Sequence, residues 1–352
     1  MSQTNVKTLL AQKHTNLDPR LREMLSEFLE FKEEILPSQY WEKLNKKHLK
    51  QIADNSYEQF KRTISRNYFT FIIPPWNQQT RFLIHALPFD RVVSIFFSAW
   101  LAPRHDLLKS YQSFYYNLLT KLLWAYVEKN NPKHLLDRLS EPLQGNPPRV
   151  YQGKRLISQD LANSFLEYLS IMNADVDKNE IRTIMELGSG YGRSAYVHLT
   201  LRPECRYIFV DIPPALYVCE KYLSDVFKDR KIFKFRSFDR YEDIKEEYEN
   251  ADTIFLMPNQ LELLPEKSVD LFINISSLHE MQLDQIRYYF KVIEKMTRKY
   301  FYTKQWKKTK NIYKNNVIIR QSDYPVNKNW RQIYARECKV QNLFFEELYD
   351  LS

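Results

Sequence analysis

The residues best suited to chemistry in this chain form a glycine-rich turn. Three of the five glycines, Gly188, Gly190 and Gly192, fall within one short stretch. Apolar residues lead into the turn over 181–187, which predicts a short buried strand, and apolar residues over 195–199 predict the start of a helix. A strand, a glycine turn and a helix N-terminus together let the backbone approach a ligand closely. We therefore expect a ligand-binding site here.

The spacing around this turn discriminates between ligands. A dinucleotide fingerprint has the spacing Gly-x-Gly-x-x-Gly. Counted from Gly188, the third glycine is replaced by Arg193, and counted from Gly190 it is replaced by Ala195, so only a degenerate match remains. A P-loop is excluded because no Gly-Lys-Ser/Thr follows. Glu186 would repel a pyrophosphate, whereas it suits the ammonium and sulfonium groups of S-adenosylmethionine. The pattern favours this methyl donor, with contacts expected from Glu186, Gly188, Ser189, Gly190, Gly192 and Arg193.

A second apolar run, 206–210, ends in the acidic residue Asp211. In a doubly wound fold, an acid at this strand end accepts hydrogen bonds from ribose hydroxyls. We expect Asp211 to do so, and Ile212 beside it to line the same cofactor. Asp211 also precedes Pro213, so it is a candidate N-cap for the next helix. The two roles are compatible.

Two further strands are predicted over 253–257 and 268–275, with a polar loop between them. The loop follows the carboxyl end of the first strand, where ligands bind in such sheets. Asn259 and Gln260 in this loop are expected to bond the adenine amino group and ring nitrogen. The alternative is that they only build a capped turn around Pro258.

A general base is expected just after the strand over 268–275. Methyl transfer to a hydroxyl needs the reacting atoms in line and the hydroxyl proton removed. His279 is the first candidate because its unperturbed pKa lies near neutrality, and Glu280 is the second. A purely structural histidine is the alternative. Glu280 and Asp284 would face one divalent cation if both lay on a helix, but this spacing is common on solvated faces, so we assign no metal.

The end of the predicted fifth strand carries Lys304, Gln305 and Trp306. The indole face is suited to stacking on a sugar ring, and the lysine to bonding a hydroxyl or phosphate. We expect these three residues to contact the acceptor. The alternative is a tryptophan packed at the rim beside a solvated lysine.

These segments resemble class I methyltransferases, and more narrowly a bacterial family of sugar O-methyltransferases. The resemblance covers most of the chain and is carried by residues 60–64, 67–69, 153–164, 186–193, 210–216, 258–262, 274–281 and 302–306. It implies an α/β fold with a Rossmann-like class I methyltransferase sheet and S-adenosyl-L-methionine as cofactor. It also implies an acceptor hydroxyl on a sugar, in a nucleotide sugar or a surface-polysaccharide precursor.

Composition sets the alternatives to this interpretation. The chain has 352 residues and a net charge of +9, which raises an RNA methyltransferase as a rival, although no continuous basic stripe or RNA-binding module is present. A rival of another class is a non-catalytic protein that binds the cofactor as a partner in polysaccharide assembly. The apolar run 92–102 is too short to span a membrane, no secretory signal begins the chain, and the three cysteines lack metal spacing. We expect a cytoplasmic enzyme with free thiols. The sequence does not decide between a monomer and a homo-oligomer.

The organisation expected is a mostly helical domain over 1–149 followed by the cofactor-binding domain over 150–352. Helices are predicted over 18–36, with Asp18 as the cap, after Ser38 and over 105–129. The proline-rich stretch 140–149 marks the boundary. Ser158 then caps a helix to Met172, strands and helices alternate, and strands over 332–339 and 344–349 close the sheet. The first domain is expected to choose the acceptor or to mediate oligomerisation.

Overall fold

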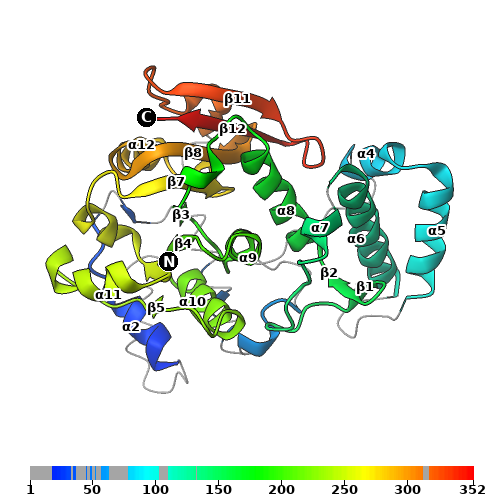
Figure 1. The fold of residues 1–352 in the computed structure, drawn as a ribbon, viewed down its shortest axis with the longest axis horizontal. Coiled ribbons are helices and arrows are strands. Elements are labelled where there is room, and N and C mark those ends of the chain that lie inside the picture. The colour runs from blue at the N-terminus through cyan, green and yellow to red at the C-terminus, as the bar shows by residue number, and fades with distance from the viewer. Residues whose placement is uncertain are drawn as a thin grey trace.

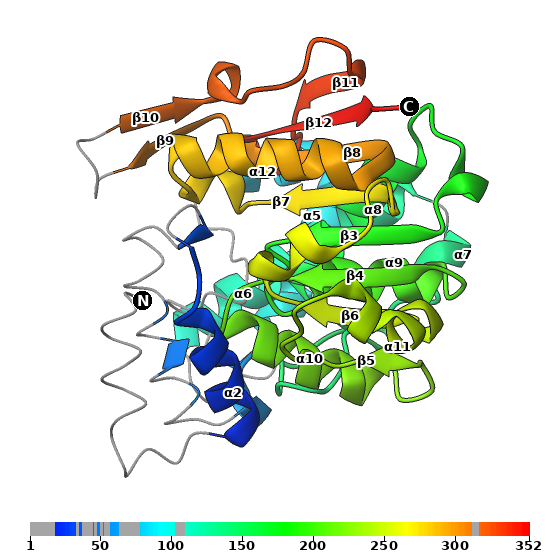
Figure 2. The same ribbon diagram turned by 90° about the vertical axis from the view of Figure 1, so that its left-hand side faces the viewer.

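The fold is organised around one eight-stranded sheet (Figures 1 and 2). The computed structural model describes residues 18–32, 35–36, 45, 48–49, 52, 57–62, 78–102, 110–131, 133–311 and 317–352. In spatial order the strands are β11 (Arg331–Glu337), β12 (Phe344–Asp350), β8 (Thr297–Trp306), β7 (Val269–Ile275), β3 (Thr183–Leu187), β4 (Arg206–Val210), β6 (Thr253–Leu256) and β5 (Ile232–Phe233). The six strands from β8 to β5 are parallel to one another. β12 runs antiparallel to β8, and β11 runs antiparallel to β12.

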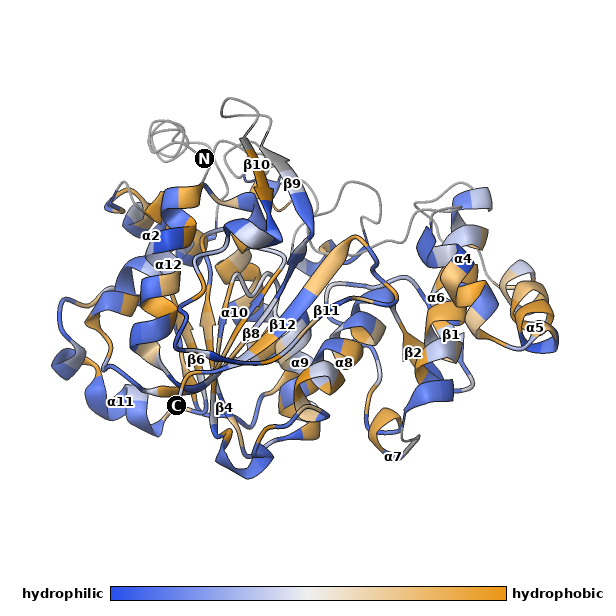
Figure 3. Ribbon diagram, turned by 90° about the horizontal axis from the view of Figure 1, so that it is seen from above, coloured by the Kyte–Doolittle hydropathy of each residue, from blue (hydrophilic) through white to orange (hydrophobic). Residues whose placement is uncertain are grey.

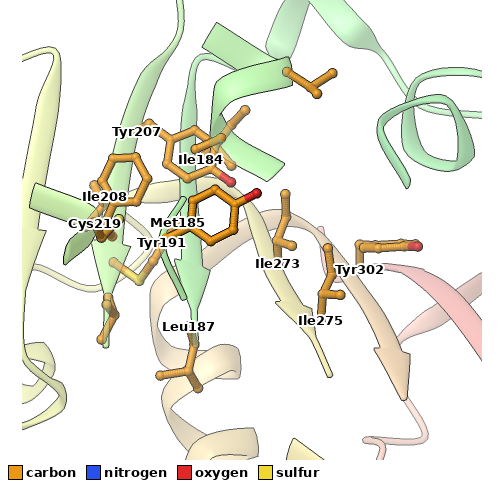
Figure 4. Close-up of a cluster of buried hydrophobic side chains, with 14 of the residues drawn as sticks. Ile184, Met185, Leu187, Tyr191, Tyr207, Ile208, Cys219, Ile273, Ile275 and Tyr302 are labelled. Atoms are coloured by element: carbon orange, nitrogen blue, oxygen red, sulfur yellow. The ribbon is translucent and has the colours of Figure 1, made fainter. Parts of the chain in front are cut away.

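The central strands are apolar along their length because both faces of a parallel sheet are covered. Every residue of β6 and β7 is buried. Figure 4 shows part of the resulting core, in which Ile184 of β3 and Ile273 of β7 lie on one face of the sheet and Ile208 of β4 lies on the other. The strands predicted from apolar runs are confirmed, and so are the two closing strands. The Rossmann-like α/β fold class is confirmed with them.

Helices cover both faces of this sheet (Figure 3). α8 (Gln159–Met172) and α9 (Arg193–Leu201) pack against each other, and α12 (Leu283–Met296) packs against β8. α10 (Ala215–Val226) and α11 (Lys245–Asn250) complete the set. Ser158 caps α8 as predicted, since its hydroxyl accepts from the Leu161 amide at 3.0 Å. The strand order reverses at β3, between β4 and β7, which places the ligand crevice at the carboxyl ends of these strands.

The described residues before 140 are mostly helical, as expected. α4 (Gln78–Ala86), α5 (Phe89–Trp100) and α6 (Ser110–Asn130) pack together, α7 (Lys133–Leu136) follows, and α6 also contacts α8. α6 matches the predicted helix over 110–129, and the first residues of that prediction, 105–109, lie outside the described residues. The apolar run 92–102 falls largely in α5, where Phe89 and Trp100 are exposed. Among the described residues, we find no helix with the length and hydropathy that crossing a membrane requires.

α2 (Pro19–Phe28) is shorter than the predicted helix over 18–36. Asp18 caps it as expected, by accepting from the Arg20 amide at 2.8 Å. The helix ends at Phe28, and the chain turns over Leu29 and Glu30. The apolar positions beyond 28 that suggested a longer helix, Phe31 and Ile35, are buried outside it, with the Phe31 ring 5.0 Å from the Phe28 ring. The helix predicted after Ser38 lies largely outside the described residues.

Contacts from the first 62 residues reach the sheet domain across the expected boundary. Figure 2 shows α2 beside α10, where Arg20 Nε lies 2.8 Å from a carboxylate oxygen of Glu220. Lys61 is fully buried, with its amine 2.5 Å from Glu141 Oε1 and 3.0 Å from the Tyr222 hydroxyl. A division at 140–149 stays a prediction, but these described segments are packed against the second half of the chain.

Two hairpins were not foreseen in the sequence. β1 (Val150–Gln152) pairs with β2 (Arg155–Ile157) just before α8, and β9 (Lys308–Asn311) pairs with β10 (Val317–Arg320) after β8. The three cysteines are free and buried, as predicted for thiols.

Candidate active site

The three glycines of the turn have the same backbone conformation and different surroundings. All have positive φ, which favours glycine at each. A Cβ at Gly188 would stand 2.4 Å from Ser277 Oγ, and one at Gly192 would stand 2.5 Å from Leu223 Cδ1. A Cβ at Gly190 would meet no heavy atom of the described residues within 4 Å. Two of the glycines thus permit close packing of the protein on itself, and Gly190 faces open space.

Asp211 is held at the edge of this space by the turn itself. Its Oδ2 accepts from the Gly190 amide at 2.7 Å, and its Oδ1 accepts from the Ile212 amide at 2.7 Å. α10 begins only at Ala215 and receives no side-chain cap, so Asp211 does not act as its N-cap. Burial raises the pKa of Asp211 to about 7. The carboxylate is oriented by two backbone amides and retains further lone pairs for a ligand.

Glu186 lies beneath the turn on β3 and is buried. The Tyr207 hydroxyl donates to its Oε2 at 2.7 Å, and burial raises the pKa of Glu186 to about 8. A cation bound nearby would lower this pKa and favour the carboxylate. The Ser189 hydroxyl faces the Cys219 thiol at 3.9 Å. Arg193 turns toward α8.

Arg193 joins a buried charge network behind the turn. Its guanidinium donates to both carboxylate oxygens of Glu167, at 2.7 and 3.1 Å, and to the Ser164 hydroxyl at 2.8 Å. The Lys304 amine lies 2.8 Å from the same carboxylate. Arg193 was predicted to contact the cofactor and Lys304 the acceptor. The two cations lie side by side inside the protein because they share the Glu167 carboxylate.

Asn259 and Gln260 follow β6 in a 3₁₀ turn over Pro258–Leu263. The Gln260 side chain accepts from the Met257 amide at 2.9 Å and donates to the Arg236 carbonyl at 2.7 Å, so it builds the capped turn that was the alternative. The Asn259 amide nitrogen donates to Glu27 of α2 at 2.7 Å. Its Oδ1 is buried and accepts no hydrogen bond from the described residues. That oxygen is therefore an available acceptor for an amino group.

His279 is buried in a 3₁₀ turn, Leu278–Glu280, directly after β7. Its Nδ1 lies 2.9 Å from Gln305 Oε1. The Gln305 amide nitrogen donates to the Asn274 carbonyl at 3.1 Å and to Thr303 Oγ1 at 3.0 Å, which fixes Oε1 as an acceptor. This bond at 2.9 Å favours the tautomer with the proton on Nδ1 over the longer contact of the Trp306 amide with Nδ1 at 3.5 Å, and it leaves on Nε2 the lone pair that a base needs.

Asn274 and Ser277 connect His279 to the glycine turn, and sequence reasoning did not select either. The Asn274 amide nitrogen donates to the Leu187 carbonyl at 2.9 Å and to Ser277 Oγ at 2.7 Å. Its Oδ1 accepts from Gln305. The available signal was an asparagine in the otherwise apolar end of β7. This buried chain of hydrogen bonds positions the candidate base relative to the turn.

The two candidate bases are adjacent and have opposite pKa shifts. His279 Nε2 lies 3.7 Å from Glu280 Oε1. Burial lowers the pKa of His279 to about 4. Burial, with the charge of Asp211 added, raises the pKa of Glu280 to about 8. At neutral pH the imidazole is neutral and the Glu280 carboxyl is mostly protonated. Glu280 also lies close enough to Asp211 to feel its charge.

The helical pairing expected of Glu280 and Asp284 is wrong. The chain leaves the 3₁₀ turn at Met281, and α12 begins at Leu283 after its N-cap Gln282, so the two acids do not share a helix. Asp284 is solvent-exposed and pairs with Arg287. In the part of the chain that the structure describes, no group of three histidine, cysteine, aspartate or glutamate residues is arranged to hold a metal ion.

The three residues expected to contact the acceptor have different surroundings. Lys304 is buried, with its amine bonded to Glu167 and Gln341, and Gln305 is buried behind His279. Contact of either with a substrate would require these bonds to open. Trp306 is 40% exposed, and its ring lies 5.6 Å from the His279 ring. Of the three, Trp306 alone has a face available beside the candidate base.

Comparisons with known proteins give distant structural likenesses. No family model matches the chain, and no curated protein matches it. The solved structures similar to it include the mitomycin 7-O-methyltransferase MmcR, at 12% identity over 78% of this chain and 76% of that one, with a TM-score of 0.37. An S-adenosylmethionine-dependent methyltransferase from Aquifex aeolicus is 14% identical over 49% and 84%, with a TM-score of 0.29. Another from Leishmania major is 12% identical over 53% and 71%, with a TM-score of 0.36. At this distance the likenesses carry no function across.

Proposed function

We propose that this chain binds S-adenosylmethionine at the glycine turn and transfers its methyl group to a hydroxyl oxygen. The observation that carries the proposal is the open space at Gly190, bordered by the Asp211 carboxylate. Asp211 is placed to accept from the ribose hydroxyls. Asn259 Oδ1 is an unused acceptor for the adenine amino group, and a cationic methionine end bound nearby would favour the carboxylate form of Glu186.

The acceptor groups around this space also argue against a dinucleotide. A pyrophosphate needs backbone amides or cations, yet the Gly190 amide is already bonded to Asp211 and Arg193 is paired with Glu167. The buried Glu186 carboxyl, when ionised, would repel it. S-adenosylmethionine has no phosphate, and its sulfonium supplies a methyl group that is already activated.

His279 is the group we assign to remove the acceptor proton. Gln305 holds the proton on Nδ1, so the lone pair stays on Nε2. Glu280 lies 3.7 Å from that nitrogen and is the alternative base. Trp306 packs beside the imidazole and helps to exclude water from it. The residues thus hold one proton-accepting atom in place next to the predicted methyl donor.

The pH dependence of transfer separates the two bases. At saturating S-adenosylmethionine, a base with the lowered pKa of His279 gives a rate that is constant above about pH 5, whereas Glu280 acting as carboxylate gives a rate that rises until about pH 9. Replacing the true base by His279→Ala or Glu280→Gln should slow transfer about 10²–10⁴-fold and leave the affinity for S-adenosylhomocysteine nearly unchanged. Full activity in both variants would remove this site from the mechanism.

A sugar hydroxyl is the acceptor that we propose, on a nucleotide sugar or a surface-polysaccharide precursor. The support is the family resemblance of segments such as 274–281 and 302–306, together with the exposed indole of Trp306 beside His279. Mass spectrometry of surface glycans from strains with and without the gene tests it. The expected result is the loss of one methyl group from a single sugar. Unchanged glycans together with a methylated RNA would favour the rival acceptor.

A further inference from the structure

A polar cavity of about 300 Å³ lies apart from the glycine turn, between the helical part and the sheet part of the molecule. Its walls come from the end of α6, from α8, and from β8, β11 and β12, elements that Figure 1 shows meeting beside α8. Lys304 of β8 lines it. Successive strand residues point to opposite faces of a sheet, so the cavity lies on the other face of β8 from Gln305 and its bond to His279. Junctions of this kind are common places for ligand sites.

Asn163 of α8 stands in the cavity wall with an unused donor. Its side chain is 1% exposed, and its amide nitrogen has no hydrogen-bond partner among the described residues. A buried donor left in this state costs about 1–3 kcal/mol. Leucine at this position would avoid the cost, since the same helix already carries Leu166 and Leu169 in the cavity wall. A ligand oxygen that accepts from Asn163 would account for the amide.

Most charged side chains of the wall are already paired. Lys304 lies 2.8 Å from Glu167, which it shares with Arg193, and the half-exposed Arg336 lies 2.7 Å from Glu346. A charged ligand would compete with these pairs for its partners. Uncharged ligands have no such competition.

The remaining wall combines amides with apolar side chains. Asn130 and Asn131 at the end of α6 use their amide nitrogens on the Tyr126 and Val127 carbonyls, so their side-chain oxygens are oriented as acceptors. The Tyr126 ring and the Val340 side chain supply apolar surface. A sugar ring has matching features, with hydroxyls around its edge and C–H groups on its faces.

We propose that this cavity binds an uncharged, hydroxyl-rich ligand of the size of a sugar ring, with Asn163 donating to one of its oxygens. The site lies outside the proposed methyl-transfer centre, and binding there does not require the methyl donor. With a saccharide chain as methyl acceptor, the cavity would hold a ring other than the one that is methylated.

Saturation-transfer NMR on the full chain, without S-adenosylmethionine, tests the proposal. The probes are methyl glucoside, methyl galactoside, methyl mannoside, rhamnose and N-acetylglucosamine, with sulfate and phosphate as anionic competitors. At least one sugar should bind, and neither anion should displace it. Asn163→Leu should weaken that binding about tenfold. The control Asn250→Leu removes an exposed amide from α11 and should have no effect.

Thermal unfolding of the same variants separates a binding role from a structural one. Because the Asn163 nitrogen has no partner to lose, Asn163→Leu should unfold at the same or a higher temperature than the wild type. If this variant does not fold, Asn130→Trp at the exposed end of α6 should obstruct the cavity and abolish sugar binding. The proposal is overturned if no sugar of the panel binds, if the anions displace the sugar, or if both cavity variants bind sugar as the wild type does.

Discussion

Alanine substitutions within the glycine turn should separate ligand binding from folding. Gly190→Ala adds a methyl group that meets no described atom within 4 Å, so its cost to the fold is the strain of a left-handed backbone, about 1–2 kcal/mol. Gly188→Ala adds the same strain and forces its methyl group against Ser277 Oγ at 2.4 Å. Overpacking of this kind costs a further 1–3 kcal/mol, roughly. The total for Gly188→Ala is then about 2–5 kcal/mol.

Gly190→Ala, the milder of the two changes for the fold, should have a large effect on ligand binding. The methyl group of Gly190→Ala occupies the space that we assign to the cofactor, so the affinity for S-adenosylhomocysteine should fall at least tenfold, or about 1.4 kcal/mol. Gly153→Ala is the matched control, because Gly153 also has positive φ and open space around its Cβ, but lies in the β1–β2 turn. This control should lose the same stability and keep its affinity.

Chemical denaturation and titration calorimetry measure the two quantities separately. Denaturation with an unchanged slope gives the loss of unfolding free energy for each variant. Calorimetry with S-adenosylhomocysteine gives the affinity of the variants that remain folded. Wild-type affinity in Gly190→Ala, or an equal loss of affinity in Gly153→Ala, would refute the reasoning, since the open space at the turn would then not be the ligand site.

Three further outcomes are expected. In ¹⁵N spectra, His279 should be protonated on Nδ1, and Gln305→Leu should produce a mixture of tautomers; an Nε2-protonated ring in the wild type would contradict the assignment. S-adenosylhomocysteine should bind about tenfold more tightly at pH 8 than at pH 6, because the Asp211 carboxyl, with a pKa of about 7, must ionise to accept the ribose hydroxyls, and Asp211→Asn should remove this dependence. Lys61→Met should destabilise the fold by about 3–5 kcal/mol in denaturation experiments, because Glu141 loses its buried cation; a loss below about 1 kcal/mol would show that the pair is dispensable.

The glycine turn and the strands around it were predictable because local pattern determines them. The apolar run before Gly188 and the apolar run before Asp211 are each long enough to define a strand, and parallel strands bring their carboxyl ends together. The contact between Asp211 and the Gly190 amide then follows from the fold. The same reasoning found the caps at Asp18 and Ser158, since capping depends on neighbouring residues alone.

The roles of Lys304 and Gln305 were not predictable, because they depend on partners distant in sequence. Lys304 is held by Glu167 of α8, and Gln305 by Asn274 of β7, and neither pairing has a local signature. Spacing alone also suggested that Glu280 could share a helix with a later acid. The chain leaves its helical turn immediately after Glu280, and periodicity does not reveal such a break.

Contacts from α2 are a second feature that local pattern could not show. Glu27 is not itself a predicted site residue. It accepts a hydrogen bond from the Asn259 amide nitrogen, which leaves Asn259 Oδ1 as the acceptor. A helix expected to belong to a separate domain thus orients a residue of the proposed adenine site.

Calorimetric titration of the purified full chain with S-adenosylhomocysteine and, separately, with NAD tests the central claim most directly. The arrangement of Gly190, Asp211 and Glu186 predicts one site for S-adenosylhomocysteine per chain and no heat of binding for NAD. Binding of S-adenosylhomocysteine should be weakened by roughly 1.5–3 kcal/mol in Asp211→Ala, the scale of hydrogen bonds to a charged group. Binding of NAD instead, or equal binding of S-adenosylhomocysteine by wild type and Asp211→Ala, would contradict the account.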